Sequence, residues 1–269
     1  MHVGVNEITS RQRLYFASIG LLGLWVGVWG TFSPTEADRA LPWLVPPLHA
    51  RFLGAVYLSA ALMLAWGLAA RRQAEVRVMI LLITLWTGLL MVLSLLHLSA
   101  FDPHHRPVWF WFGAYALYPV VGAWSLRAHG GLRRGDEGPA LPAWAQRSLV
   151  AAGAAAVVLS LLLLLLPEAM TGMWPWKITP LLAQLYSAPF GAYGLSFVLL
   201  GRGRTWPEAR IVVRGACVFA ALVLVASVLH RKLFDPGRIA TWAWFAGFAA
   251  ALALLGTLQL RLRAPRVRA

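Results

Sequence analysis

Cysteine and acidic residues are scarce in this chain, and several familiar catalytic motifs are missing. Cys217 is the only cysteine in 269 residues, which excludes an intramolecular disulfide and a metal site built from several thiolates. The sequence contains no glycine-rich phosphate-binding loop, no His-Glu-x-x-His zinc motif and no Gly-x-Ser-x-Gly nucleophile motif. No Asp or Glu falls inside the long apolar segments, where an ion-coupled carrier generally needs a polar group. We therefore expect neither a hydrolase nor a pump.

Charged residues of both signs are also too few for a soluble domain. They make up 13% of the sequence, against 59% hydrophobic residues. Eight apolar segments are long enough to span a hydrocarbon core of roughly 30 Å, namely residues 14–30, 50–70, 76–98, 108–126, 148–166, 182–200, 209–230 and 240–260. The first lacks a small-residue cleavage site, so we expect it to be retained. The sequence predicts an all-α membrane protein with eight transmembrane helices.

The net charge of +14 is distributed as in a membrane protein. If the N-terminus is cytoplasmic, seventeen of the 24 Lys and Arg residues fall at inner ends and loops and seven at outer ones, while the ten acids divide evenly. This positive-inside pattern predicts a multi-pass protein of the cytoplasmic (inner) membrane with both termini in the cytoplasm. We expect membrane lipids as partners, through anionic headgroups. Other membrane subunits are further candidates, and nucleic acid is not expected.

The sequence repeats itself at an offset of 133 residues. Residues 34–116 and 167–249 share 23 identities in 83 positions without a gap. The matches include residues whose placement apolar composition does not explain, such as His97 with His230 and Trp111 with Trp244. We therefore predict a duplication, with a first four-helix repeat at 1–126, a cytoplasmic linker at 127–147 and a second repeat at 148–269.

The arrangement of the two repeats follows from the number of spans in each. An even number inserts both repeats the same way round, so the tandem parallel repeats should be related by an axis along the membrane normal. We expect two four-helix bundles packed side by side, with helix contacts through small residues. Gly20, Gly23 and Gly27 suit such a contact face.

Each repeat carries a His-x3-Phe-Asp-Pro motif: His97, Phe101, Asp102 and Pro103, and then His230, Phe234, Asp235 and Pro236. In a structural interpretation the His complements the dipole at a helix C-terminus. The Asp then caps the next helix, with Pro at its first position. In a second interpretation the two histidines ligate a haem or a metal between the halves. A hydrogen-bonding or substrate-binding role is the third.

His49 has no counterpart in the second repeat, where Leu182 stands. It is either a satisfied rim residue or one member of a site formed with His97 in the first repeat.

A second repeated motif, Arg-x3-Glu-x-Arg, lies near the inner ends of the predicted helices. Its members are Arg71, Glu75 and Arg77 in the first repeat and Arg204, Glu208 and Arg210 in the second. We expect exposed cytoplasmic ion pairs that orient a tight turn and contribute about 0–1 kcal/mol each. Docking of a partner is the alternative.

A family resemblance rests on the segment PPLHARFLGAVYLSAALML at residues 46–64, the arginine-flanked loop after it and the Leu-His-x3-Phe-Asp corner. Together these resemble bacterial polytopic integral membrane proteins of uncharacterised function, built from a duplicated four-span unit. The resemblance covers most of each repeat. It implies membrane residence and no particular activity.

We expect a non-enzymatic membrane protein: a small-molecule or lipid binder or facilitator, or an accessory subunit of a membrane complex. Any site should lie on the extracytoplasmic rim between the repeats, where His97, His230 and His49 are candidate cofactor-binding residues; the cofactor itself stays open. The alternative is a haem- or metal-bearing membrane oxidoreductase that uses these histidines. Haem A synthase has a similar plan, but this chain has one repeated His per half and lacks acid-rich outer motifs beside the histidines.

Overall fold

The computed structural model describes residues 7–39, 45–135 and 138–262, and these form helices joined by short connections. The basic residues at positions 263, 266 and 268, which contribute to the predicted orientation, lie outside the described residues. The long helices are α1 (Ser10–Phe32), α2 (Pro47–Ala69), α3 (Gln73–Leu96), α4 (Arg106–Ala128), α5 (Ala143–Leu165), α7 (Pro180–Gly201), α8 (Trp206–Leu229) and α9 (Ile239–Arg261). Shorter elements are η1 (Pro34–Arg39), η2 (Leu98–Ala100), α6 (Pro167–Met173) and η3 (Arg231–Leu233).

Six of the long helices are apolar enough to cross a membrane: α1, α2, α3, α5, α8 and α9. Helices α4 and α7 have similar lengths, but each contains an internal proline, Pro119 or Pro189, and several polar or aromatic residues. A set of apolar helices this long fits a multi-pass membrane protein.

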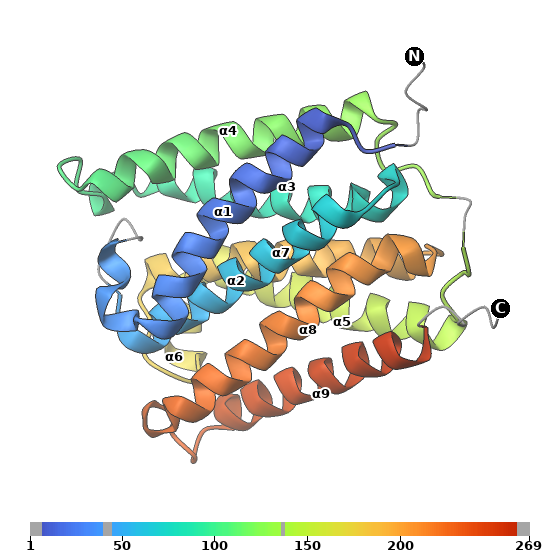
Figure 1. Ribbon diagram of the computed structural model, residues 1–269. Helices are drawn as coiled ribbons and strands as arrows, with labels where there is room; N and C mark the ends of the chain where they lie inside the picture. Colours follow the sequence, from blue (N-terminus) through green and yellow to red (C-terminus); the bar gives the residue numbers. More distant parts are fainter. Residues whose placement is uncertain (1–6, 40–44, 136–137, 263–269) are drawn as a thin grey trace.

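The long helices form a central group of four surrounded by an outer four. In the centre, α2 packs against α8, α7 packs against α3, and α3 also touches α8. On the outside, α1 covers α2, α5 covers α7, α4 covers α3 and α9 covers α8 (Figure 1). Helices α2 and α3 make little contact with each other, and neither do α7 and α8. The expected pair of separate bundles packed side by side is therefore wrong. The first half of the chain, with helices α1–α4, and the second half, with α5–α9, share one central bundle.

The side chain of Phe52 shows why α2 packs against the other half. Its ring lies 4.4 Å from the ring of Tyr186, 5.8 Å from that of Phe219 and 6.0 Å from that of Trp244, measured between centroids. These three partners come from α7, α8 and α9. An aromatic side chain of the first half thus completes the aromatic core of the second half, which gains favourable offset and edge contacts between rings.

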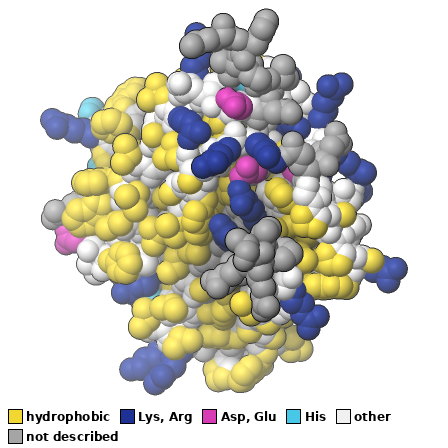
Figure 2. Space-filling model, turned by 45° about the vertical axis from the view of Figure 1, so that its right-hand side comes forward, with side chains coloured by type: hydrophobic (Ala, Val, Ile, Leu, Met, Phe, Trp, Pro, Cys, Tyr) yellow, Lys and Arg dark blue, Asp and Glu magenta, His cyan; other side chains and the backbone are white. Residues whose placement is uncertain are grey.

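The two ends of the bundle differ in character. The corners at residues 97–105 and 230–238 lie at one end, together with α6, and we call this the corner end (Figure 1). Helix α1 begins and α9 ends at the opposite end, the linker end, where residues 129–135 also lie. Figure 2 is turned toward the linker end and shows Lys and Arg side chains gathered there beside acidic ones, with hydrophobic side chains over the flanks. Apolar flanks between charged ends suit a bilayer.

Helices α1 and α4 meet near the linker end and separate toward the corner end. Near the linker end, the Gln12 side chain donates to the Ser125 hydroxyl at 3.0 Å, and the Tyr15 hydroxyl donates to the Tyr118 carbonyl at 3.2 Å. Beyond these bonds the two helices diverge (Figure 1) and make little further contact. Residues of both helices line a pocket of the first half.

Close helix contacts run through glycine, as predicted for the face of α1. A β-carbon on Gly27 would lie 2.8 Å from the backbone nitrogen of Leu58 in α2. In the second half, a β-carbon on Gly194 would lie 2.9 Å from the carbonyl oxygen of Gly153. Backbones approach this closely only where no side chain intervenes, which is how helices associate in membranes without a hydrophobic driving force.

We expect Gly27→Ala to lower the free energy of unfolding by about 1–3 kcal/mol, because the added methyl group must push α1 away from α2. Thermal unfolding in a mild detergent measures the effect. Gly256→Ala is the matched control, because a β-carbon on Gly256 in α9 meets nothing within 4 Å. The control should be neutral or slightly more stable, since Ala favours a helix over Gly. Equal melting temperatures for the two variants would contradict the close contact.

Candidate functional site

Both aspartates of the repeated motif form turns within the corners. The Asp102 carboxylate accepts the backbone N–H of His104 at 2.8 Å, and the Asp235 carboxylate accepts that of Gly237 at 2.9 Å. A carboxylate that accepts the backbone N–H two residues ahead forms an Asx turn. The two corners therefore reverse the chain by the same local device.

The predicted helix caps at these aspartates are wrong in detail. Helix α4 has His105 at its N-cap position, and α9 has Arg238. Pro103 and Pro236 thus lie in the turn and not at the first position of a helix. The physical reason is that the Asx turn takes up the two residues after each Asp, so the helix begins only after the turn has closed.

Four tryptophans brace the corners with matching hydrogen bonds. Each indole N–H donates to a carbonyl or hydroxyl oxygen at 2.8–2.9 Å: Trp109 to the Pro103 carbonyl, Trp242 to the Pro236 carbonyl, Trp111 to Ser94 Oγ and Trp244 to Ser227 Oγ. The tryptophans and serines lie on the helices that meet at each corner, and the two prolines lie in the turns between those helices. The bonds of Trp111 and Trp244 join the two helices of each corner, and those of Trp109 and Trp242 hold the turn against the helix that follows it.

The repeated histidines end their helices, as predicted, and each contacts the other half. His97 is the C-cap residue of α3, and His230 is that of α8. Nε2 of His97 lies 2.6 Å from the side-chain oxygen of Gln184, and Nε2 of His230 contacts the guanidinium of Arg51. Gln184 and Arg51 themselves stand 133 residues apart. The repeat offset would have shown that these two residues are equivalent, but not that each meets the histidine of the opposite half.

These contacts bear on the haem or metal interpretation of the histidines. An imidazole ligates iron or another metal through a ring nitrogen without a competing partner. Ligation through Nε2 of His97 or His230 would first have to displace Gln184 or Arg51. Within the described part of the chain, no group of three or more His, Cys, Asp or Glu side chains is placed to hold a metal ion.

His49 lies in the interior between α2 and α7. Its Nδ1 is 2.6 Å from the Tyr186 hydroxyl, and its ring packs 6.3 Å from that of Trp176. His49 is therefore a buried residue with a hydrogen-bond partner in the second half. A site shared with His97 remains a prediction.

The repeated Arg-x3-Glu-x-Arg motif is largely buried at the linker end, and the expected exposed ion pairs are wrong. The side chains of Arg204 and Glu208 are 4% and 1% exposed and form an ion pair at 2.8 Å. Glu75 of α3 pairs with Arg210 of α8 and so joins the two halves. Arg77 is buried as well, whereas Arg71 is exposed.

The linker supplies the partners that make this burial possible. Arg77 and Arg204 both donate to the carbonyl oxygen of Arg133 at 2.9 Å, and the backbone N–H of Gly135 donates to Glu208 at 3.1 Å. Buried guanidinium and carboxylate groups require such partners, because an unpaired buried charge is strongly unfavourable. The motif therefore fastens the linker beneath both halves.

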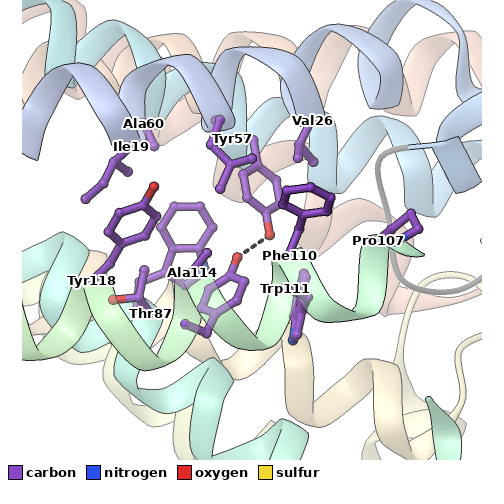
Figure 3. Close-up of a pocket in the computed structure, with 14 residues that line it drawn as sticks. Ile19, Val26, Tyr57, Ala60, Thr87, Pro107, Phe110, Trp111, Ala114 and Tyr118 are labelled. Carbon is purple, nitrogen blue, oxygen red and sulfur yellow. Dashed lines mark hydrogen bonds between the residues drawn. The ribbon is translucent and has the colours of Figure 1, made fainter. Parts of the chain in front are cut away.

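A cavity of about 60 Å³ lies within the first half, between α1, α2, α3 and α4 (Figure 3). Its lining is almost entirely apolar and aromatic, from Ile19, Leu22, Gly23, Val26, Ala60, Trp86, Pro107, Phe110, Trp111 and Ala114, with the hydroxyl-bearing residues Tyr57, Thr87, Tyr115 and Tyr118. We call it the lateral pocket. The sequence led us to expect a site on the rim between the repeats. The lateral pocket lies instead inside the first repeat.

The polar feature of the lateral pocket is a pair of phenols. The hydroxyls of Tyr57 and Tyr115 are hydrogen-bonded to each other (Figure 3), and both side chains are buried. Two hydroxyls that share one hydrogen bond still have one O–H to donate and lone pairs to accept. The pair can therefore bind a further oxygen atom inside a largely apolar space.

The second half lacks this feature at the equivalent positions. At an offset of 133, Tyr57 corresponds to Phe190 and Tyr115 to Phe248, so neither hydroxyl is present. The ring of Phe248 packs 4.5 Å from that of Trp244, much as Tyr115 packs 4.3 Å from Trp111. Sequence comparison of the two repeats contained this signal as a Tyr-to-Phe difference at two positions. Only the structure shows that the two tyrosines touch.

The contact between His230 and Arg51 predicts a pH dependence. Burial and the nearby guanidinium lower the pKa of His230, so the unfolded chain takes up a proton at a pH where folded His230 stays neutral. The free energy of unfolding should therefore fall as the pH drops below about 6.5. Melting temperatures between about pH 8 and pH 5 measure this fall, and His230→Gln should reduce it.

His97→Gln is the matched control, since it alters the same position in the other half, where the partner is the neutral Gln184. This variant should keep the acid-dependent loss of stability. An unchanged pH profile in His230→Gln would contradict the role given to Arg51.

Comparison with known proteins adds no further assignment. No protein-family model matches the chain, and no curated protein or solved structure matches it.

Proposed function

We propose that this chain is an eight-span membrane protein, formed by duplication of a four-span unit, that binds one neutral and mostly apolar molecule from the bilayer without transforming it. The binding site is the lateral pocket, and the single observation that carries the proposal is the Tyr57–Tyr115 hydroxyl pair inside it.

The eight-span topology is supported by helix length. Helices α4 and α7 contain 23 and 22 residues, close to those of the six more apolar helices. At 1.5 Å per residue such helices are about 33 Å long, enough to cross the hydrocarbon core. Duplication is supported by the matching Asp turns and tryptophan hydrogen bonds of the two corners. The excess of basic residues near the linker end favours a cytoplasmic location for that end.

The membrane topology can be tested by cysteine labelling in a Cys217→Ala background. Ser99→Cys and Lys232→Cys place a thiol at each corner, and Leu132→Cys places one in the linker; all three side chains are exposed. A membrane-impermeant maleimide added to intact cells should label the corner variants but not the linker variant. Inverted membrane vesicles should give the opposite result. Labelling of corner and linker from the same side would contradict the topology.

The ligand of the lateral pocket should be uncharged. Its lining includes no Asp, Glu, Lys, Arg or His. A charged group would lose its hydration there without gaining a counter-ion, which is strongly unfavourable inside a membrane. A neutral oxygen, by contrast, can accept the hydrogen bond that the Tyr57–Tyr115 pair offers. The pocket therefore suits a lipid-like molecule with at least one hydroxyl or carbonyl oxygen.

The pocket is accessible from the side of the bundle. Phe110 of α4 lines it and is 72% exposed, on the flank that the proposed topology places in lipid. Because α1 and α4 diverge there, a ligand can enter between them without first crossing into water.

Binding without chemistry follows from the same lining. It offers no carboxylate, imidazole, thiol or amine to act as a general base or nucleophile near neutral pH. The lateral pocket therefore has the lining of a binding site but not the groups of a catalytic one.

Binding can be tested with a long-chain alcohol that carries a photoactivatable diazirine, in phosphatidylcholine vesicles. Cross-links should fall on peptides of α1 and α4. Tyr57→Phe together with Tyr115→Phe should weaken binding about tenfold, because one hydrogen bond in an apolar space is lost. Tyr186→Phe, which removes a buried hydroxyl bonded to His49, is the control and should bind as the parent does. Labelling that is unaffected by the double change would refute the proposed site.

A further inference from the structure

Trp86 separates the lateral pocket from two smaller voids. Its indole lines all three spaces. The second void, of about 10 Å³, lies between Trp86, Tyr57, Leu185 and Pro189. The third, bounded by Trp86, Met63, Leu82, Pro189 and Tyr193 among others, is too narrow to hold a water molecule. Removal of this one side chain would therefore join spaces that are now distinct.

The two smaller voids lie at the seam between the halves. Leu185, Pro189 and Tyr193 belong to α7 of the second half, while Trp86 belongs to α3 of the first. Trp86 is 5% exposed, and its ring centroid is 5.1 Å from that of Tyr57. The indole thus forms the inner wall of the lateral pocket, directly behind one member of the hydroxyl pair.

The size of the pocket limits what can reach that wall. An apolar protein cavity that holds a benzene ring has a volume of about 150 Å³, whereas the lateral pocket has about 60 Å³. A ligand whose oxygen bonds the Tyr57–Tyr115 pair must place its polar head against Trp86 and leave its tail toward the opening between α1 and α4. The pocket thus has less than half the volume of a cavity that holds a benzene ring, which favours a small head over a ring.

We propose that the lateral pocket takes lipids with a small neutral head, such as long-chain alcohols and aldehydes, and that Trp86 is the specificity-determining residue that excludes ring-headed lipids such as phenols and quinones. This inference rests on the function proposed above and narrows its ligand class. At the equivalent position of the second half stands Phe219, whose ring packs 5.8 Å from that of Phe248, the counterpart of Tyr115.

The test compares two neutral probes with the same diazirine-bearing alkyl tail, one ending in a primary alcohol and the other in a phenol, in phosphatidylcholine vesicles. The protein as it stands should be labelled at α1 and α4 by the alcohol at least about tenfold more strongly than by the phenol, corresponding to the loss of one well-made buried contact. Trp86→Ala should shift this ratio toward the phenol about tenfold, with new cross-links on α7.

Two further variants keep the result interpretable. Trp86→Phe carries the side chain that the second half already has at this position, so it should fold and shift the ratio in the same direction by a smaller factor; its melting temperature checks folding. Phe219→Ala enlarges the equivalent position of the second half and should leave the ratio unchanged.

The outcomes separate this inference from the proposed function. Equal labelling of the parent by both probes, with labelling still dependent on Tyr57 and Tyr115, would overturn the role of Trp86 and leave the binding site intact. An unshifted ratio in folded Trp86→Ala and Trp86→Phe would overturn it too. Alcohol labelling that does not depend on the two tyrosines would refute the proposed function itself.

Discussion

The packing of each half's central helices against those of the other half is the constraint on which the rest of the structure depends. Helix α2 packs against α8, and α7 packs against α3. Phe52 of α2 is one example, because its ring packs against three aromatic rings of the second half. In a membrane, where helix association relies on van der Waals contact and hydrogen bonds, faces that fit one another hold the halves together. Neither half buries these faces alone.

Polar contacts complete the seam between the halves at both ends. At the corner end, His97 meets Gln184 and His230 meets Arg51. At the linker end, Glu75 meets Arg210. Between the ends, His49 bonds Tyr186 and Ser59 bonds Tyr193 across the seam. These polar contacts fix the register that the apolar faces alone would leave less specific.

The two halves share the plan of their corners and differ in their interiors. Their corners keep the same turns and tryptophan bonds, because each must reverse the chain at a helix end with its backbone groups satisfied. Their interiors differ, since the first half holds the Tyr57–Tyr115 pair beside a cavity and the second half holds Phe190 and Phe248. Under the proposed duplication, one copy of the unit would have lost the hydroxyls that the other retains. This asymmetry accounts for a single proposed site in a protein with two similar halves.

The sequence by itself determined where helices form and where the chain turns. Apolar segments coincide with the eight long helices, and His97 and His230 end theirs as the motif predicted. Tertiary structure alone decided the rest. Hydropathy shows which segments avoid water but not which neighbour each will choose, so the shared bundle could not be predicted. The burial of Glu208 depends on a linker that folds back beneath it, and the lateral pocket depends on the divergence of α1 from α4. Both arise from contacts between residues distant in the sequence, which local patterns do not encode.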